Sequence, residues 1–226
     1  MFTIYDYTDA TRLFGEEFAS KETATRDPGD TYTTIDSPVI ITADGFEAEV
    51  SDAGRYVVTE ENGQIKRITI EEFKQGLARQ LITNTATLDD FRAKWINPTE
   101  RRGMIQDLVT GGYSPEIVRQ VEGMTDYDLY DVLADLAYGV APHKRADRAF
   151  SFSYKQRSWF ETMPEQTKAV VLAIAAQFGR EGTEAFENPQ LFNVESIRTA
   201  GGINALKMGG NPADLITETK RRLFAA

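Results

Sequence analysis

The stretch that most constrains this chain is TDYDLYDVLADLAYG, residues 125–139. Thr125 can accept a free backbone N–H at the start of a helix, and Gly139 followed by Pro142 is typical of a helix end. At about 100° per residue, the aliphatic side chains and the tyrosines fall on two opposite arcs. A surface helix normally carries one apolar stripe, so this pattern predicts a central helix that is buried on both sides.

Three aspartates, Asp128, Asp131 and Asp135, fill the sector between these two arcs. Such a stripe can hold a hard cation through its carboxylate oxygens, or it can pair with arginines of neighbouring helices. We favour ion pairs, because arginines such as Arg101, Arg102 or Arg145 can satisfy the aspartates without a bound ion. The predicted structural ion-pair residues are Asp128, Asp131, Arg101 and Arg145.

Short β-prone segments flank two hairpin turn signals near the N-terminus. The segments are Val39–Thr42 and Phe46–Val50 around Asp44-Gly45, then Arg55–Thr59 and Gln64–Ile70 around Glu61-Asn62-Gly63. A sheet of this size buries little surface by itself, so we expect it to lean on the helices.

From Thr69 onward the apolar residues recur with a helical period, beginning at the capping-box pattern Thr69-Ile70-Glu71-Glu72. The helices predicted beside the central one are a first helix to about Asn84, then Thr87–Trp95, Pro98–Thr110, Pro115–Glu122, Pro142–Phe150, Lys155–Phe160, Pro164–Gly179 and Pro212–Phe224. The predicted fold class is therefore mainly α, a multi-helix bundle with a small antiparallel β-hairpin sheet near the N-terminus.

We divide the chain into three parts. Residues 1–38 form an N-terminal helix and a polar linker, residues 39–70 form a small β element packed on the helices, and residues 71–226 form the helical C-terminal domain. Because a domain seldom begins as abruptly as the strand-like run at Phe2, we expect a further domain upstream of it in the parent protein.

Bulk composition narrows the function classes. The 226 residues carry a net charge of −10 and include no cysteine, which excludes disulfides and thiolate chemistry. No run of about 18 apolar residues and no signal-peptide pattern is present, so we expect a cytoplasmic protein with no membrane partner. The acidic balance argues against a chain that coats DNA phosphates over its whole surface.

No complete catalytic motif is present, so we assign no catalytic, cofactor-binding or metal-binding residue. A phosphate loop is missing, and His143 is the one histidine, which we place at the surface instead of in a general-base role. Glu72-Phe73-Lys74 and Glu218-Thr219-Lys220 match the end of a PD-(D/E)xK nuclease motif. Both triplets are predicted to be helical, where residues two apart diverge by about 200° and cannot face one metal.

Lys144, Arg145 and Arg148 make the segment that starts at Pro142 basic. These three side chains are the candidates for phosphate contacts, although an ion-pair face toward the aspartate stripe explains them equally well. The tyrosines of the central helix are assigned to the core, because a base-stacking platform needs a basic surface around it.

A series of matches in order and spacing then points to a family. The residues are Trp95-x-x-Pro98-x-x-Arg101, Leu108, Gly112, Asp128-Leu129-Tyr130-Asp131-Val132-Leu133, Ala137-Tyr138, Pro142 and Arg145. Together they resemble the C-terminal region of type I restriction enzyme R (motor) subunits, most specifically across residues 91–148. The opening Phe2–Tyr7 is similar to the exit from the second RecA-like motor domain of those subunits.

The resemblance implies a parent restriction-modification endonuclease that translocates and cleaves DNA using ATP and, we expect, Mg. The family's catalytic motifs match no position here, so this fragment needs no cofactor of its own. We therefore expect a non-catalytic assembly domain that docks the motor subunit onto the methyltransferase and specificity subunits, with DNA reached through the complex. Two alternatives stay open: a DNA-contacting module that holds duplex near the motor, and a cation-dependent hydrolase that uses the aspartate stripe.

Overall fold

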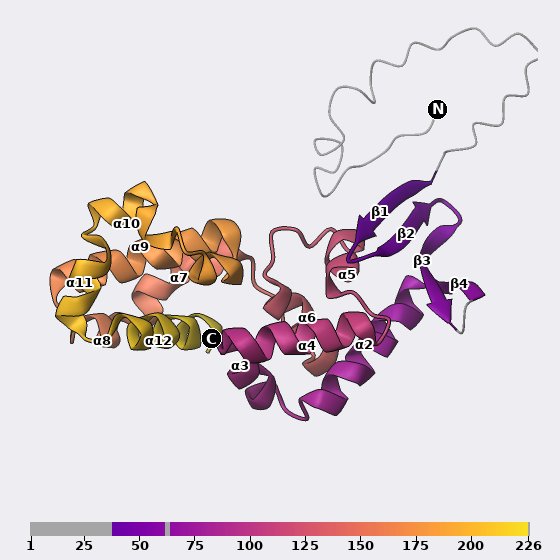
Figure 1. Ribbon diagram of the computed structural model, residues 1–226, viewed down its shortest axis with the longest axis horizontal. Coiled ribbons are helices and arrows are strands. Elements are labelled where there is room, and N and C mark those ends of the chain that lie inside the picture. The colour runs from indigo at the N-terminus through magenta and orange to yellow at the C-terminus, as the bar shows by residue number, and fades with distance from the viewer. Residues whose placement is uncertain (1–37, 62–63, 226) are drawn as a thin grey trace, which may run out of the picture. The chain divides into compact units, whose positions relative to one another are not determined.

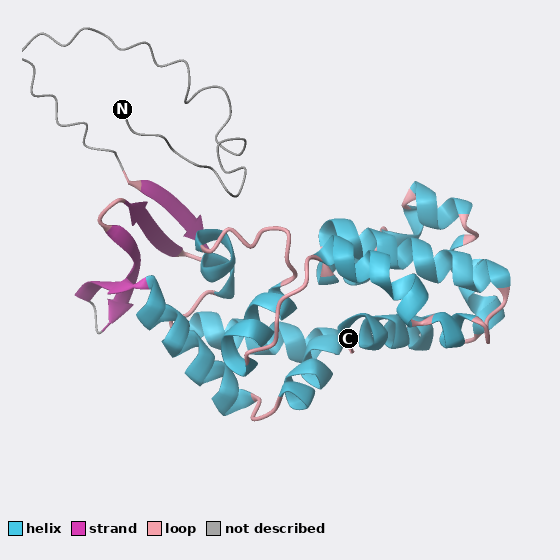
Figure 2. Ribbon diagram, turned by 180° about the vertical axis from the view of Figure 1, so that it is seen from behind, coloured by secondary structure: helices cyan, strands magenta, loops and turns pink. Residues whose placement is uncertain are grey.

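A computed structural model describes residues 38–61 and 64–225 of the chain. The described part is mainly helical and has a four-stranded antiparallel sheet near its N-terminal end (Figure 1), which confirms the predicted fold class. The helix and linker predicted within residues 1–37, and the turn predicted at Asn62-Gly63, lie outside the described residues. Figure 2 shows the strands gathered together and helices forming the rest of this part.

The sheet is a meander in the order β1-β2-β3-β4. Its strands are β1 Val39–Ala43, β2 Phe46–Ser51, β3 Gly54–Glu61 and β4 Gln64–Thr69. Asp44 and Gly45 have φ values of 51° and 82°, the two left-handed residues that a tight hairpin turn requires. The cross-strand neighbours Ala48 and Val57 are buried, and the sheet contacts helices α2 and α5.

The helices follow at close intervals. They are α2 Ile70–Asn84, α3 Leu88–Ile96, α4 Pro98–Thr110, α5 Pro115–Val121, α6 Leu129–Tyr138, α7 Arg145–Lys155, α8 Arg157–Phe160, α9 Glu165–Glu181, α10 Glu195–Thr199, α11 Gly202–Gly209 and α12 Pro212–Phe224, with 3-10 turns η2 Thr183–Glu187 and η3 Leu191–Asn193. Thr69 and Glu72 form the predicted capping box at the start of α2. Thr87, Asn97 and Ser114 cap the next three helices through their side-chain oxygens.

The central helix α6 begins at Leu129, three residues later than predicted. Asp128 caps it instead of Thr125, because residues 126–127 pair with the chain that enters α7. Tyr127 forms an isolated antiparallel bridge with Lys144, and the Arg145 N–H donates to the Asp126 carbonyl at 3.0 Å. The predicted stop is confirmed: Gly139 has a φ of 66°, which ends the helix in the left-handed conformation.

The same pairing corrects the start of α7. The helix runs from Arg145 to Lys155, whereas the sequence predicted Pro142–Phe150. Pro142 and His143 lie outside any helix, and Lys144 is held extended by its bridge to Tyr127. As a result, Phe150 lies in the middle of α7 and not at its end.

The core around α6 is aromatic. Phe91 of α3 stacks on Tyr130 of α6 with ring centroids 5.2 Å apart, and the ring centroid of Phe224 of α12 lies 4.4 Å from that of Tyr130. On the opposite arc, Val132 and Leu133 are buried as well, and α6 contacts α2, α3 and α5. The prediction of a central helix buried on both sides is confirmed.

Candidate functional site

A buried ion pair joins α6 to α7. Arg148 donates to both carboxylate oxygens of Asp131, at 2.6 Å from Nη2 to Oδ1 and 3.0 Å from Nε to Oδ2. The same guanidinium donates from Nη1 to the Leu223 carbonyl at 2.8 Å, and the His143 N–H donates to Asp131 Oδ1 at 2.9 Å. Burial raises the pKa of Asp131, while the Arg148 guanidinium opposes that rise. The pair therefore ties α6, α7 and α12 together.

Asp128 connects α6 to the turn η2. Its carboxylate accepts from the Tyr130 N–H at 3.0 Å, and also from the Thr183 N–H at 2.7 Å and the Thr183 hydroxyl at 2.9 Å. The Trp95 indole N–H donates to the same hydroxyl at 3.2 Å. Gly182, with a φ of 80°, allows this approach, because a Cβ there would lie 2.7 Å from Asp128 Oδ2.

Thr183→Val tests this connection. The substitution keeps the shape of the side chain but leaves the buried Trp95 indole N–H without its acceptor. We expect the free energy of unfolding to fall by about 1–3 kcal/mol, the usual cost of an unsatisfied buried polar group. Urea denaturation followed by tryptophan fluorescence measures it; an unchanged midpoint and slope would show that the hydroxyl contributes nothing. Exposed Thr217 gives the control, Thr217→Val.

A third charged group lies between α4, η2 and α12. Arg101 is fully buried, donates from Nη1 to the Trp95 carbonyl at 3.1 Å and places Nη2 2.5 Å from Glu187 Oε1. Lys220 of α12 reaches the same carboxylate oxygen at 3.4 Å. Burial lowers the pKa of Lys220, and the charge of Glu187 opposes that effect. Glu187 therefore lies at ion-pair distance from two buried cations, Arg101 and Lys220.

The remaining sequence-predicted residues occupy different surroundings. Exposed Lys144 pairs with Asp126 at 3.3 Å, and Arg145 points Nη1 at the Tyr127 carbonyl, 3.4 Å away. Asp135 is exposed. Within residues 38–61 and 64–225, neither Asp128 nor Arg145 makes an ion pair. Of the four predicted ion-pair residues, Asp131 pairs with Arg148, and Arg101 pairs with Glu187.

Sequence reasoning missed three residues of these groups: Thr183, Glu187 and Lys220. Each meets its partner only because the chain returns over a separation of 33 to 88 residues. No local pattern marks them, although the glycine before Thr183 is a signal for an unusual backbone.

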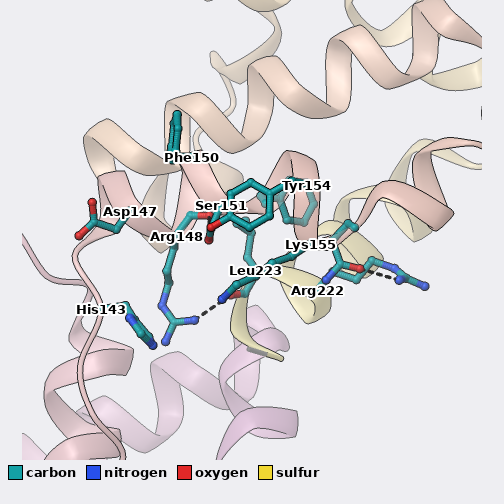
Figure 3. A pocket seen from close by; sticks show the side chains of 11 residues that line it. His143, Asp147, Arg148, Phe150, Ser151, Tyr154, Lys155, Arg222 and Leu223 are labelled. Atoms are coloured by element: carbon teal, nitrogen blue, oxygen red, sulfur yellow. Dashed lines mark hydrogen bonds between the residues drawn. The ribbon is translucent and has the colours of Figure 1, made fainter.

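An open pocket of about 320 Å³ lies beside the Asp131–Arg148 pair, between α7 and the end of α12 (Figure 3). Its lining residues are His143, Asp147, Arg148, Phe150, Ser151, Phe152, Tyr154, Lys155, Gln156, Arg222 and Leu223. In Figure 3, His143 lies at one end and Arg222, which donates to Gln156 Oε1 at 2.8 Å, lies at the other. The pocket therefore opens to the surface, and two of its lining residues, Arg148 and Leu223, are buried and joined by a hydrogen bond.

Two kinds of feature, a metal-binding cluster and a membrane-spanning helix, are absent from the part of the chain that the structure describes. No group of three or more His, Asp or Glu side chains is arranged to hold a metal ion there. None of the helices found in it has the length and apolar content needed to cross a membrane.

The fold and these contacts define a mainly helical domain that has a hydrophobic core rich in aromatic residues, contains buried ion pairs and carries an accessible pocket lined in part by aromatic side chains. Comparison of its sequence with family profiles identifies it further. The profile of the EcoEI R protein C-terminal family matches residues 71–223, and the chain belongs to that family. The predicted resemblance to the C-terminal region of type I R subunits is confirmed.

A curated relative agrees with this assignment. The chain is 26% identical over 135 residues to the type I restriction enzyme EcoAI endonuclease subunit of Escherichia coli. The match covers 60% of this chain but 16% of that protein, so the chain corresponds to a small part of its relative. No solved structure matches the chain.

Proposed function

We propose that this chain is the assembly domain of a type I restriction enzyme R subunit, which docks the motor subunit onto the methyltransferase and specificity subunits. The observation that carries the proposal is that the buried charged side chains pair with groups inside the domain. Asp131, Arg148, Arg101, Glu187 and Lys220 contact one another or backbone carbonyls across helices that are distant in sequence. Such cross-links suit a rigid body that holds a fixed docking face.

The same proposal extends to the parent protein, because the family is that of type I R subunits. The parent subunit would translocate and cleave DNA with ATP and Mg in the cytoplasm, and the chain would meet DNA through the assembled complex. Residues 71–226 would form the docking unit, residues 39–70 a small β element beside it, and residues 1–38 the connection to the motor.

A pull-down with the purified cognate methyltransferase–specificity complex tests the docking role. We expect the 226-residue chain to be retained by the complex and to compete with the full R subunit for it. Retention of the full subunit without retention of this chain would place docking elsewhere and refute the proposal.

Duplex DNA alone provides the contrasting measurement. An assembly domain with a net charge of −10 should show no steeply salt-dependent DNA binding. Strong binding at 50 mM salt that is lost at 200 mM salt would instead support a DNA-contacting module. In that case Lys144 and Arg145 would be the first residues to substitute.

A further inference from the structure

Helix α7 exposes two large aromatic side chains. Phe150 is 78% exposed and Tyr154 is 61% exposed, and no other aromatic residue of the described ranges is exposed to this degree. They lie one helical turn apart, with ring centroids separated by 6.4 Å and planes at 73°. Isolated exposed apolar residues are ordinary, but two aromatic rings packed on each other at the surface are typical of the centre of a protein interface.

The helix itself requires no such exposure. Phe152 and Arg148 are buried on the inner face of α7, and this helix contacts α9 and α12. Phe150 lies about 200° from Phe152 around the helix axis, so it faces away from this core. A polar residue at position 150 would serve the fold equally well, which leaves the exposed ring without a role inside the domain.

The pocket next to these rings is unevenly charged. Four of its lining side chains, His143, Arg148, Lys155 and Arg222, are basic, and one, Asp147, is acidic. Arg148 is engaged by Asp131 and Arg222 by Glu218, whereas Lys155 meets no carboxylate at ion-pair distance in residues 38–61 and 64–225. The end of the pocket near Lys155 therefore presents an unpaired ammonium group.

The geometry points to the α7 surface, defined as Phe150, Tyr154, Lys155 and the adjoining pocket, as the face that receives an acidic peptide segment of the methyltransferase–specificity complex. This inference rests on the proposed docking function. An apolar side chain of the segment lies against Phe150 and Tyr154, and a neighbouring carboxylate pairs with Lys155. The pocket volume of about 320 Å³ is large enough for the inserted side chain. Asp147 lies two turns before Lys155, about 12 Å along the helix. It therefore does not compete with the carboxylate of the peptide for Lys155.

Binding of single variants of the 226-residue chain to the immobilised cognate complex tests the surface. Phe150→Ala should weaken binding by about 30-fold, as truncation of an aromatic anchor commonly does. Lys155→Glu should weaken it by about 10-fold, mainly through slower association, and the loss should shrink at high salt. Both residues are exposed, so the thermal midpoint should stay at the wild-type value.

Two variants of α11 serve as matched controls. Met208→Ala removes another exposed apolar side chain, and Lys207→Glu reverses another exposed lysine; both should bind as wild type does. If the wild-type chain binds and Phe150→Ala binds equally well, the α7 surface is refuted while docking stands. If the wild-type chain fails to bind, both proposals fall. If Phe150→Ala loses affinity for a 30-base-pair duplex and not for the complex, the surface belongs to nucleic acid and the inference is overturned.

Discussion

Replacing Asp131 with asparagine is expected to lower the free energy of unfolding by about 3–5 kcal/mol. The Asp131 side chain is 1% exposed, and its charge compensates the Arg148 guanidinium, which is nearly as deeply buried. Asparagine cannot supply that charge, so the buried Arg148 guanidinium loses the carboxylate that compensates it. Urea denaturation followed by circular dichroism measures the loss.

Asp135 provides the control, since it lies one helical turn further along α6 but is exposed. Asp135→Asn should change the free energy of unfolding by less than about 0.5 kcal/mol. Replacing the whole pair, as Asp131→Leu with Arg148→Met, should cost less than Asp131→Asn alone, because the buried guanidinium is removed together with the carboxylate that compensates it. Equal losses for Asp131→Asn and Asp135→Asn would contradict the importance of the buried pair. A folded Asp131→Asn variant that had lost an activity would revive the hydrolase alternative.

Glu187→Gln is expected to have an effect of similar size, about 3–5 kcal/mol, because Glu187 is the nearest carboxylate to two buried cations. Its neighbour Glu184 is the control: it lies 3.6 Å from Arg101 but is 75% exposed, so Glu184→Gln should cost less than about 1 kcal/mol. Thermal and urea unfolding at pH 7 compare the two. A greater loss for Glu184→Gln would reverse the assignment.

The pH dependence of Glu187→Gln follows from Lys220. Burial already holds the pKa of Lys220 below its ordinary value of 10.5, and loss of Glu187 removes the charge that opposes this shift. The unfolded chain then binds the Lys220 proton more tightly than the folded chain does. Stability of the variant relative to wild type should therefore rise as the pH increases above neutrality toward 10.5. A deficit that stays constant over this range would show that Lys220 is not the group affected.

The elements predicted most accurately are those with complete local signals. Helices α4 and α12 each begin with a proline that follows an asparagine cap, and both have the predicted bounds. The start of α6 was missed because Thr125 and Asp128 are equally good caps from local chemistry. The bridge between Tyr127 and Lys144 keeps residues 126–127 out of the helix, and Thr183, 55 residues away, donates two hydrogen bonds to Asp128.

The same limit applies to the charged groups. Helical periodicity indicates that Asp131 faces a neighbour, but it does not say which arginine of the following segment meets it. Arg145 and Arg148 are one turn apart, and the choice depends on where α7 begins. The start of α7 is set by the bridge between Tyr127 and Lys144, and no sequence pattern predicts that bridge. The exposure of Phe150 depends on the same shift, because the predicted helix ended at that residue.

The contacts of α12 have a consequence for the order of folding. Arg148 reaches the Leu223 carbonyl over 75 residues of chain, and the Phe224 ring lies against Tyr130, 94 residues earlier. Helical domains usually fold fast because most of their contacts are local. Here the aromatic core cannot close until the last helix has been made and has come back across the others. During synthesis, the surface of Tyr130 that Phe224 covers therefore stays exposed to water until α12 has formed, and in this interval the nascent chain is open to aggregation or to capture by a chaperone.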